Sequence, residues 1–295
     1  MKNAPRNDEV IQTAARNLFE GAAPERLDEL KSLWDKYHPR FNVLPDAGEE
    51  GDFIFDAGTY RDVRFNHRVM RAFWVSSFAA WEAYSTLAIS IQCGVVADFN
   101  RLNALVKCVE EILESDIPES VIFPEGIPEP GTLVDASSET ETRAAGELAI
   151  LAVGWALLHE VKHIQHQQDG SSAPLDAKPE DCHSEEHSCD SFATSFLLDT
   201  VDIYAEEHNV RPALVRQKRQ SGIYFALFAM TLMSRNKWEQ SDSHPALQER
   251  IDRVAKACRG EGSDVAAAIA HLAFLSLRQL WPNVPGLFAI GHPDS

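Results

Sequence analysis

The hydrophobic positions of this sequence recur mainly with the three- and four-residue spacing of α-helices. Helices are predicted at 8–20, 25–37, 67–90, 99–115, 184–208, 212–233, 245–259 and 264–280. The stretch 149–158 carries no charge, so it predicts a helix that is buried on nearly all sides. Residues 53–55 and 63–65 flank a turn at 56–58 and predict a small β-hairpin or edge sheet. The pattern therefore predicts a mainly α fold (α+β), with a small β element before the central buried helix.

A proline-rich stretch separates two predicted regions of the chain. Residues 118–131 contain four prolines and favour a loop or linker. We expect an N-terminal helical region with the β element at 1–130, packed on a second region at 131–295. Residues 169–183 are polar with two prolines and predict a mobile surface loop. The hairpin is either an edge strand that holds an extended substrate or a cap on the core.

Composition narrows the class of protein. A hydrophobic content of 44% is ample for a core, and the net charge of −18 argues against nucleic acid or an anionic membrane as main partner. Five cysteines without a CxxC motif do not form a disulfide framework, and the N-terminus lacks the apolar core of a signal peptide. The longest apolar stretch, 72–97, is interrupted by Glu82 and predicts a core helix, although an interfacial role stays open. We expect a cytoplasmic protein.

The central helix is predicted to carry a metal site. His159-Glu160-Val161-Lys162-His163 is an HExxH motif, in which the two histidines lie on one helical face and can bind one ion. Glu160 is about 100° away around the helix, where it can reach a water bound to that ion. The alternative is a helix whose surface charges match the motif by chance. Burying two histidines and a glutamate beside an apolar segment costs several kcal/mol unless a metal compensates, so we favour the zincin arrangement, with Zn²⁺ as cofactor.

The next helix offers a third ligand. Its apolar stripe consists of Cys189, Phe192, Ala193, Phe196, Leu197 and Val201. Glu186 extends this stripe inward, where a carboxylate needs a cation, and we expect it to be the ligand in preference to His183 or His187. Asp190 falls on the same side and is predicted to accept a hydrogen bond from a ligand histidine. Glu185 is expected to be solvated.

A third segment is the sequence SHPALQERI at 243–251. Pro245 fits the first turn of a helix, and His244 just before it can point into a cleft. His244, together with Arg250, is our candidate for stabilising the oxyanion formed when water attacks a peptide carbonyl. The alternative is a capping or surface histidine.

In order and spacing, the three segments HEVKH, EHSCDSFA and SHPALQERI are similar to the HExxH, ExxxD and HP…RI motifs of M48-type gluzincin peptidases. Their flanks, in AVGWALLHEVKHIQHQ and SEEHSCDSFATSFLLD, resemble the Lit peptidase family of phage-exclusion proteins over about residues 145–255, and the FWVSSFAAWEAY region extends this likeness. The resemblance implies zinc-dependent proteolysis, with ligands His159, His163 and Glu186 and with Glu160 as catalytic acid/base. Cys189 stands where the M48 pattern more often has alanine, which is also small.

We therefore predict a cytoplasmic zinc endopeptidase with a zincin-like domain and a protein substrate. The resemblance implies elongation factor Tu as substrate and a phage-derived peptide as activator. Nucleic acid is not expected to bind, and membrane association is disfavoured but left open. One alternative is a catalytically silent zinc-binding module that binds a translation factor or phage component; Glu160 disfavours it, because metal binding alone does not need this residue. Another is a regulatory switch that senses a peptide and signals through the N-terminal half.

Overall fold

The computed structural model describes residues 8–41, 55–56, 63–131, 140–174, 176–260 and 263–288. Within them the chain is mainly helical, as predicted. Its longer helices are α1 (Asp8–Glu20), α2 (Leu27–Tyr37), α3 (His67–Cys93), α4 (Asn100–Glu114), α5 (Thr140–Asp169), α6 (Pro179–Leu198), α7 (Val201–Glu207), α8 (Pro212–Met233), α9 (Leu247–Ala257) and α10 (Ser263–Leu280). Short 3₁₀ turns occupy Pro24–Arg26 and Pro118–Ser120.

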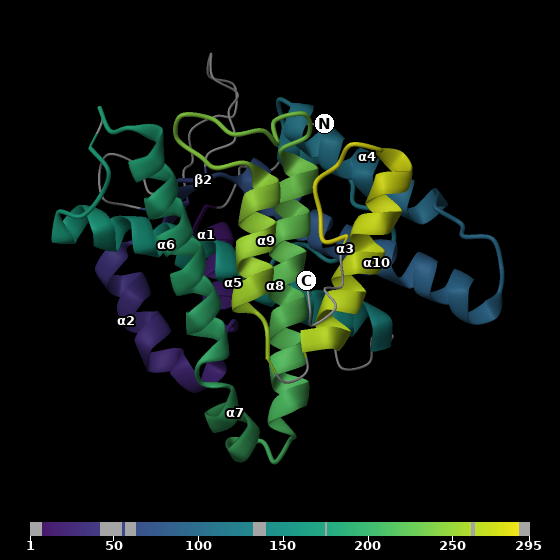
Figure 1. The fold of residues 1–295 in the computed structure, drawn as a ribbon, viewed down its shortest axis with the longest axis horizontal. Coiled ribbons are helices and arrows are strands. Elements are labelled where there is room, and N and C mark those ends of the chain that lie inside the picture. Colours follow the sequence, from purple (N-terminus) through teal and green to yellow (C-terminus); the bar gives the residue numbers. More distant parts are fainter. Residues whose placement is uncertain are drawn as a thin grey trace.

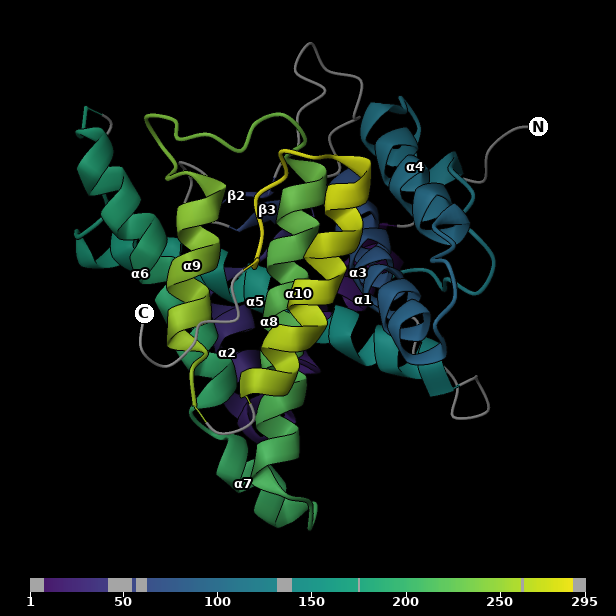
Figure 2. The same ribbon diagram turned by 45° about the vertical axis from the view of Figure 1, so that its right-hand side comes forward.

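The long helix α5 is the centre of the fold. It crosses behind α8, α9 and α10, which stand side by side with α3 when the molecule is turned (Figures 1 and 2). Buried residues from α1 to α6 and from α8 to α10 form one hydrophobic cluster, whereas α7 contributes Val201 and Ala205 to a small second cluster with Val215 of α8. The helices of the predicted N-terminal region thus share a core with the rest, and the predicted boundary near residue 131 stays a prediction.

Two glycines allow neighbouring segments to approach α5 closely. A Cβ added at Gly154 of α5 would overlap the Cβ of Ala22, which follows α1. A Cβ added at Gly222 of α8 would overlap the side chain of Leu151, which is three residues before Gly154 on α5. The helix that carries the HExxH motif therefore packs closely against two neighbouring segments, with no space for an added methyl group at either glycine.

The β structure is small. Strands β1 (Arg40–Phe41), β2 (Phe55–Asp56) and β3 (Arg64–Phe65) form a sheet in the order β1-β3-β2. β2 pairs with β3 antiparallel, which agrees with the predicted hairpin, whose remaining residues at 53–54 and 57–58 lie outside the described residues. β1 pairs with β3 in parallel and was not predicted, because its sequence reads as part of a turn-rich segment.

Three predicted boundaries are wrong. The 184–208 segment is two helices and not one, since α6 ends at Leu198 and α7 begins at Val201. α6 also begins at Pro179, so the predicted surface loop is shorter than expected. Pro245 precedes α9 and is not in its first turn, because Ala246 is the N-cap of that helix.

A tertiary contact explains the break between α6 and α7. Arg219 of α8 donates to the carbonyl oxygen of Leu197 at 2.8 Å, and Thr200 donates its hydroxyl to Glu25. These long-range bonds occupy groups at the end of α6, where local periodicity predicts a continuous helix. Local sequence contains no glycine or proline here that would mark the break.

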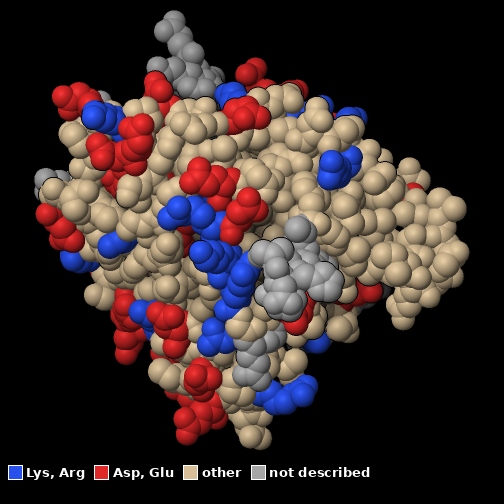
Figure 3. Space-filling view, viewed as in Figure 1, with Lys and Arg blue, Asp and Glu red and all other residues tan. Residues whose placement is uncertain are grey.

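Surface charge and apolar exposure separate on the face seen in Figure 3. Lys and Arg side chains form a band over α9, with Asp and Glu beside it, whereas the lobe formed by the connection between α3 and α4 shows almost no charged side chains. Ile91 and Val96 at this connection are 69% and 95% exposed. Among the described residues, α5 is the one helix long and apolar enough to cross a membrane, and 83% of its apolar window is buried in the protein.

Candidate metal centre

The HExxH motif lies in the buried part of α5. His159 is 5% exposed and Glu160 is 7% exposed, and His163 is partly buried one turn further on. α6 packs against this turn and presents two buried carboxylates, Glu186 and Asp190. The four-residue spacing of the histidines places both rings on the side of α5 that faces α6.

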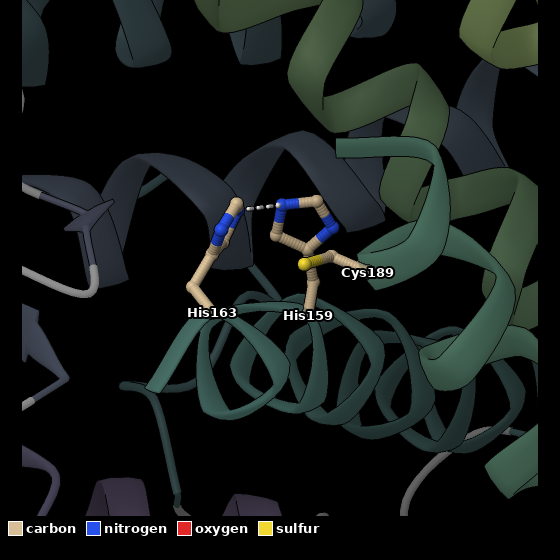
Figure 4. Close-up of side chains that lie close together, drawn as sticks. All are labelled: His159, His163 and Cys189. Atoms are coloured by element: carbon tan, nitrogen blue, oxygen red, sulfur yellow. Dashed lines mark hydrogen bonds between the residues drawn. The ribbon is translucent and has the colours of Figure 1, made fainter. Parts of the chain in front are cut away.

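The donor atoms of three side chains lie close together. The Nε2 atoms of His159 and His163 are 3.2 Å apart and face each other (Figure 4). Glu186 Oε2 lies 3.4 Å from the first nitrogen, and the other oxygen, Oε1, lies 3.3 Å from the second. Bonds of about 2.0–2.1 Å in a tetrahedron separate ligand atoms by about 3.3–3.4 Å. These three side chains are therefore close enough to hold one metal ion, and zinc stays a prediction.

Carboxylates hold the other nitrogen of each imidazole. Asp190 Oδ1 is 2.9 Å from His159 Nδ1, and Glu185 Oε1 is 2.8 Å from His163 Nδ1. Each contact fixes the ring and leaves Nε2 directed at the shared position. Asp190 was predicted to accept a hydrogen bond from a ligand histidine; the two atoms lie within hydrogen-bonding distance, and the bond itself stays a prediction. The expectation that Glu185 is solvated is wrong, because its side chain is 10% exposed and also accepts from the backbone N–H of Ala173.

Interactions among the side chains of the site favour the charged forms of His159, Glu186 and Asp190, although burial disfavours them. Burial alone would lower the pKa of His159, but hydrogen bonds to Asp190 and Glu186 outweigh it and raise this pKa. Burial would raise the pKa of Asp190, yet the Arg250 guanidinium and His159 lower it to about 2. The pKa of Glu186 is likewise held well below its ordinary value against its burial, chiefly by the charge of Arg250. The site thus contains ionised carboxylates next to paired imidazoles, a donor set suited to a divalent cation.

Arg250 lies behind the carboxylates of α6. Its Nε and Nη2 atoms donate to the two oxygens of Asp190 at 2.9 and 2.7 Å, and its Nη1 atom is 3.3 Å from Glu186. The residue is 7% exposed. This bidentate pair orients the groups that surround the histidines, and a direct oxyanion contact by Arg250 stays a prediction.

Comparison with known proteins places this chain in a family. The model of the family described as Peptidase U49 matches residues 63–271, a span that includes every candidate site residue above. The chain belongs to the Peptidase U49 family. It is also similar to the "Cell death peptidase" of Escherichia coli (strain K12), with 23% identity over 238 residues, which cover 78% of this chain and 74% of that protein. No solved structure matches the chain. These findings support the predicted peptidase and the Lit-type family, while the gluzincin details stay a prediction.

His244 of this U49 family member lies at the edge of the donor set. Its side chain is 59% exposed, and its Nε2 atom is 3.5 Å from Glu186 Oε1. Ser243 Oγ is 2.7 Å from the other ring nitrogen. The side chain is therefore accessible to solvent beside the donor set.

The alternative third ligands point elsewhere. His183 Nε2 is 2.8 Å from the carbonyl oxygen of Ser241, and His187 Nε2 is 2.9 Å from Glu249. Both histidines line a separate open pocket between α6 and α9. Three α6 side chains were considered as third ligand: His183, His187 and Glu186. Of these, Glu186 approaches both motif histidines.

Sequence reasoning missed one residue as a donor. The ligand atoms of His159, His163 and Cys189 all lie within 4.8 Å of one another, although Cys189 was assigned to the apolar stripe of α6. Its three-residue spacing from Glu186 was the available signal, because that spacing puts both side chains on the same side of a helix.

Proposed function

We propose that this peptidase is a zinc-dependent endopeptidase of the zincin type. The observation that carries the proposal is the convergence of His159 Nε2, His163 Nε2 and the Glu186 carboxylate at separations of 3.2–3.4 Å. Two buried imidazole nitrogens facing each other beside a carboxylate are expected where a cation compensates for their burial. Three protein ligands of this type leave a position open for water or substrate, as in catalytic zinc sites.

Zinc bound there would lower the pKa of a water molecule and polarise the scissile carbonyl group. Glu160 is the proposed general base that accepts the proton of the attacking water and passes it to the leaving amine. It follows His159 directly on α5, and its charge acts on His163 and on Arg250. Glu160 is therefore close to the donor set without being one of the three ligands.

Two further residues are proposed to assist. His244 is exposed beside Glu186 and is suited to donate a hydrogen bond to the developing oxyanion. Arg250 fixes Asp190, which in turn fixes His159. The main proposed role of Arg250 is thus to position the ligand His159. Direct contact with the oxyanion is its second proposed role.

We propose an intracellular protein substrate, cleaved in the cytoplasm. The support is the resemblance to phage-exclusion peptidases and the name of the Escherichia coli relative, a cell death peptidase. Elongation factor Tu is the first substrate to test, with and without a phage capsid peptide as activator. The net charge of −18 supports a protein partner over nucleic acid.

A Glu160→Gln variant tests the proposal, because it removes the base and keeps the size and helix propensity of the side chain. We expect zinc content to be unchanged and the cleavage rate to fall by about 10² to 10⁴. Glu147→Gln is the matched control, since Glu147 is on the same helix but exposed and paired with Lys218. New N-termini in a cell lysate, and cleavage of purified elongation factor Tu, would be measured with and without chelator.

Three results would refute parts of this proposal. A Glu160→Gln protein that cleaves at the wild-type rate would remove Glu160 from the role of general base. Undiminished cleavage by zinc-free protein would refute zinc dependence. A Glu160→Gln protein that arrests growth as the wild type does, without cleaving the substrate, would show that the chain acts as a zinc-binding interaction module.

A further inference from the structure

Cys189 is placed differently from the other buried cysteines. It is fully buried on α6, and its sulfur lies beside the His159 ring (Figure 4). Its Sγ atom is within 4.8 Å of the ligand nitrogens of both motif histidines. Buried Cys108 instead has its sulfur 3.9 Å from the carbonyl oxygen of Ile122, and buried Cys258 caps α9. Burial alone therefore does not account for the position of Cys189.

We propose that Cys189 is a fourth protein ligand of the metal in the resting state, so that the free protein is a latent peptidase. This inference rests on the metal site of the proposed function. With His159, His163, Glu186 and Cys189 bound, zinc has four protein donors and no position for water. Sites of that kind are structural in other proteins, whereas catalytic sites keep one position open.

The geometry on α6 supports this arrangement. Glu186 and Cys189 are three residues apart, and both face the motif histidines of α5. A Zn–S bond of about 2.3 Å next to Zn–N bonds of about 2.0 Å separates sulfur from nitrogen by about 3.6 Å. Distances of up to 4.8 Å require a movement of about 1 Å, which a side-chain adjustment supplies.

The position of Glu186 gives a reason for a fourth protein donor. Its carboxylate is shared between the histidines and Arg250, whose Nη1 atom is 3.3 Å away. A carboxylate that is also paired with a guanidinium donates less charge to a metal, and a thiolate restores it. On ligation the thiol gives up its proton to solvent. When the thiolate leaves, it takes up a proton and water occupies its place on the metal.

X-ray absorption at the zinc edge of the full-length protein tests the ligand directly. We expect one sulfur neighbour at about 2.3 Å in the wild type and in Cys108→Ala, and none in Cys189→Ala or Cys189→Ser. Cobalt-substituted protein provides a second reading, because a thiolate ligand gives a near-ultraviolet charge-transfer band. The serine side chain has nearly the volume of cysteine, so Cys189→Ser keeps the test valid if Cys189→Ala fails to fold.

Latency is tested on a denatured protein such as casein. Minor states within a few kcal/mol are populated at about 0.1–10%, so removing the thiolate should raise peptidase activity by about 10- to 1,000-fold. Zinc bound by nitrogen and oxygen alone in the wild type would overturn the proposal. A sulfur ligand without activation in either Cys189 variant would overturn latency. Failure of every protein to bind zinc or cobalt would count against the proposed function itself.

Discussion

Two buried polar clusters in this peptidase use the same kinds of side chain in opposite ways. Near α8, the Glu25 carboxylate pairs with Arg219 at 2.6 and 2.7 Å and accepts from Thr200. At the metal centre, four carboxylates surround two histidines and Arg250; they belong to Glu160, Glu185, Glu186 and Asp190. The first cluster balances one negative charge with one positive charge, whereas the second has an excess of negative charge. Charge balance thus separates a cluster suited to stabilising the fold from one suited to the proposed binding of a cation.

The largest effect is expected from breaking the balanced cluster. Glu25→Ala leaves the Arg219 guanidinium, whose side chain is 4% exposed, without its carboxylate. Removing one partner of a buried pair costs about 3–5 kcal/mol in free energy of unfolding. Denaturant unfolding measures this loss, and zinc content should not change. Glu29→Ala is the control, because Glu29 is 50% exposed in its pair with Arg26, and it should cost less than about 1 kcal/mol. Equal effects would show that the Glu25 cluster is not structural.

Metal removal should affect the other cluster. With free zinc at about 100 times its Kd, the folded protein gains about 2.7 kcal/mol, and a chelator should remove this stabilisation. Glu186→Ala should abolish the difference between zinc-loaded and chelated protein in thermal unfolding. Glu180→Ala is the matched control on α6, since Glu180 is exposed, whereas Glu185 holds His163 and does not serve as one. A zinc-dependent Tm that persists in Glu186→Ala would remove Glu186 from the ligand set.

A smaller effect is expected from the residue that orients His159. Asp190→Ala should weaken zinc binding by about 10- to 100-fold while the fold persists. Competition with a metal-sensitive dye measures the affinity, and Asp199→Ala, at the exposed end of α6, is the control. Unchanged affinity in Asp190→Ala would mean that its bond to His159 does not influence the metal.

The smallest effect is expected on the free energy of unfolding at acidic pH. Burial would raise the pKa of Glu25, but hydrogen bonds from Arg219 and Thr200 outweigh it and lower that pKa. A carboxyl group with a lowered folded-state pKa stabilises the protein above its unfolded-state pKa, and this stability is lost as the pH falls through the folded value. Glu25→Gln should therefore flatten the loss of stability below the ordinary carboxyl range. An unchanged acid slope in the unfolding free energy would contradict the assignment.

The sequence predicts the parts of the site that depend on one helix. The spacing of His159 and His163 and the stripe that includes Glu186 follow from helical periodicity alone, and the structure brings these three residues together. Periodicity does not predict which neighbour closes over a helix. The burial of Glu185 depends on Ser172 and Ala173 folding back from the loop after α5.

The same limit applies to the fold. Most helices follow from hydrophobic spacing, but the end of α6 depends on Arg219 and Thr200 reaching partners distant in the chain. The pairing of Arg250 with Asp190 likewise depends on how α9 packs on α6. Strand β1 is two residues long, too short for any alternating pattern to predict it.

The close approach at Gly154 has a consequence for how activity could be tuned at a distance. Gly154 is five residues before His159, about 7.5 Å along the axis of α5. Any larger residue at 154 must displace either Ala22 or the helix itself, and a helix moves as a rigid rod over that length. If α5 moves and Ala22 does not, both histidines move with it, so the residue at 154 can change the position of the metal-binding side chains from outside the site.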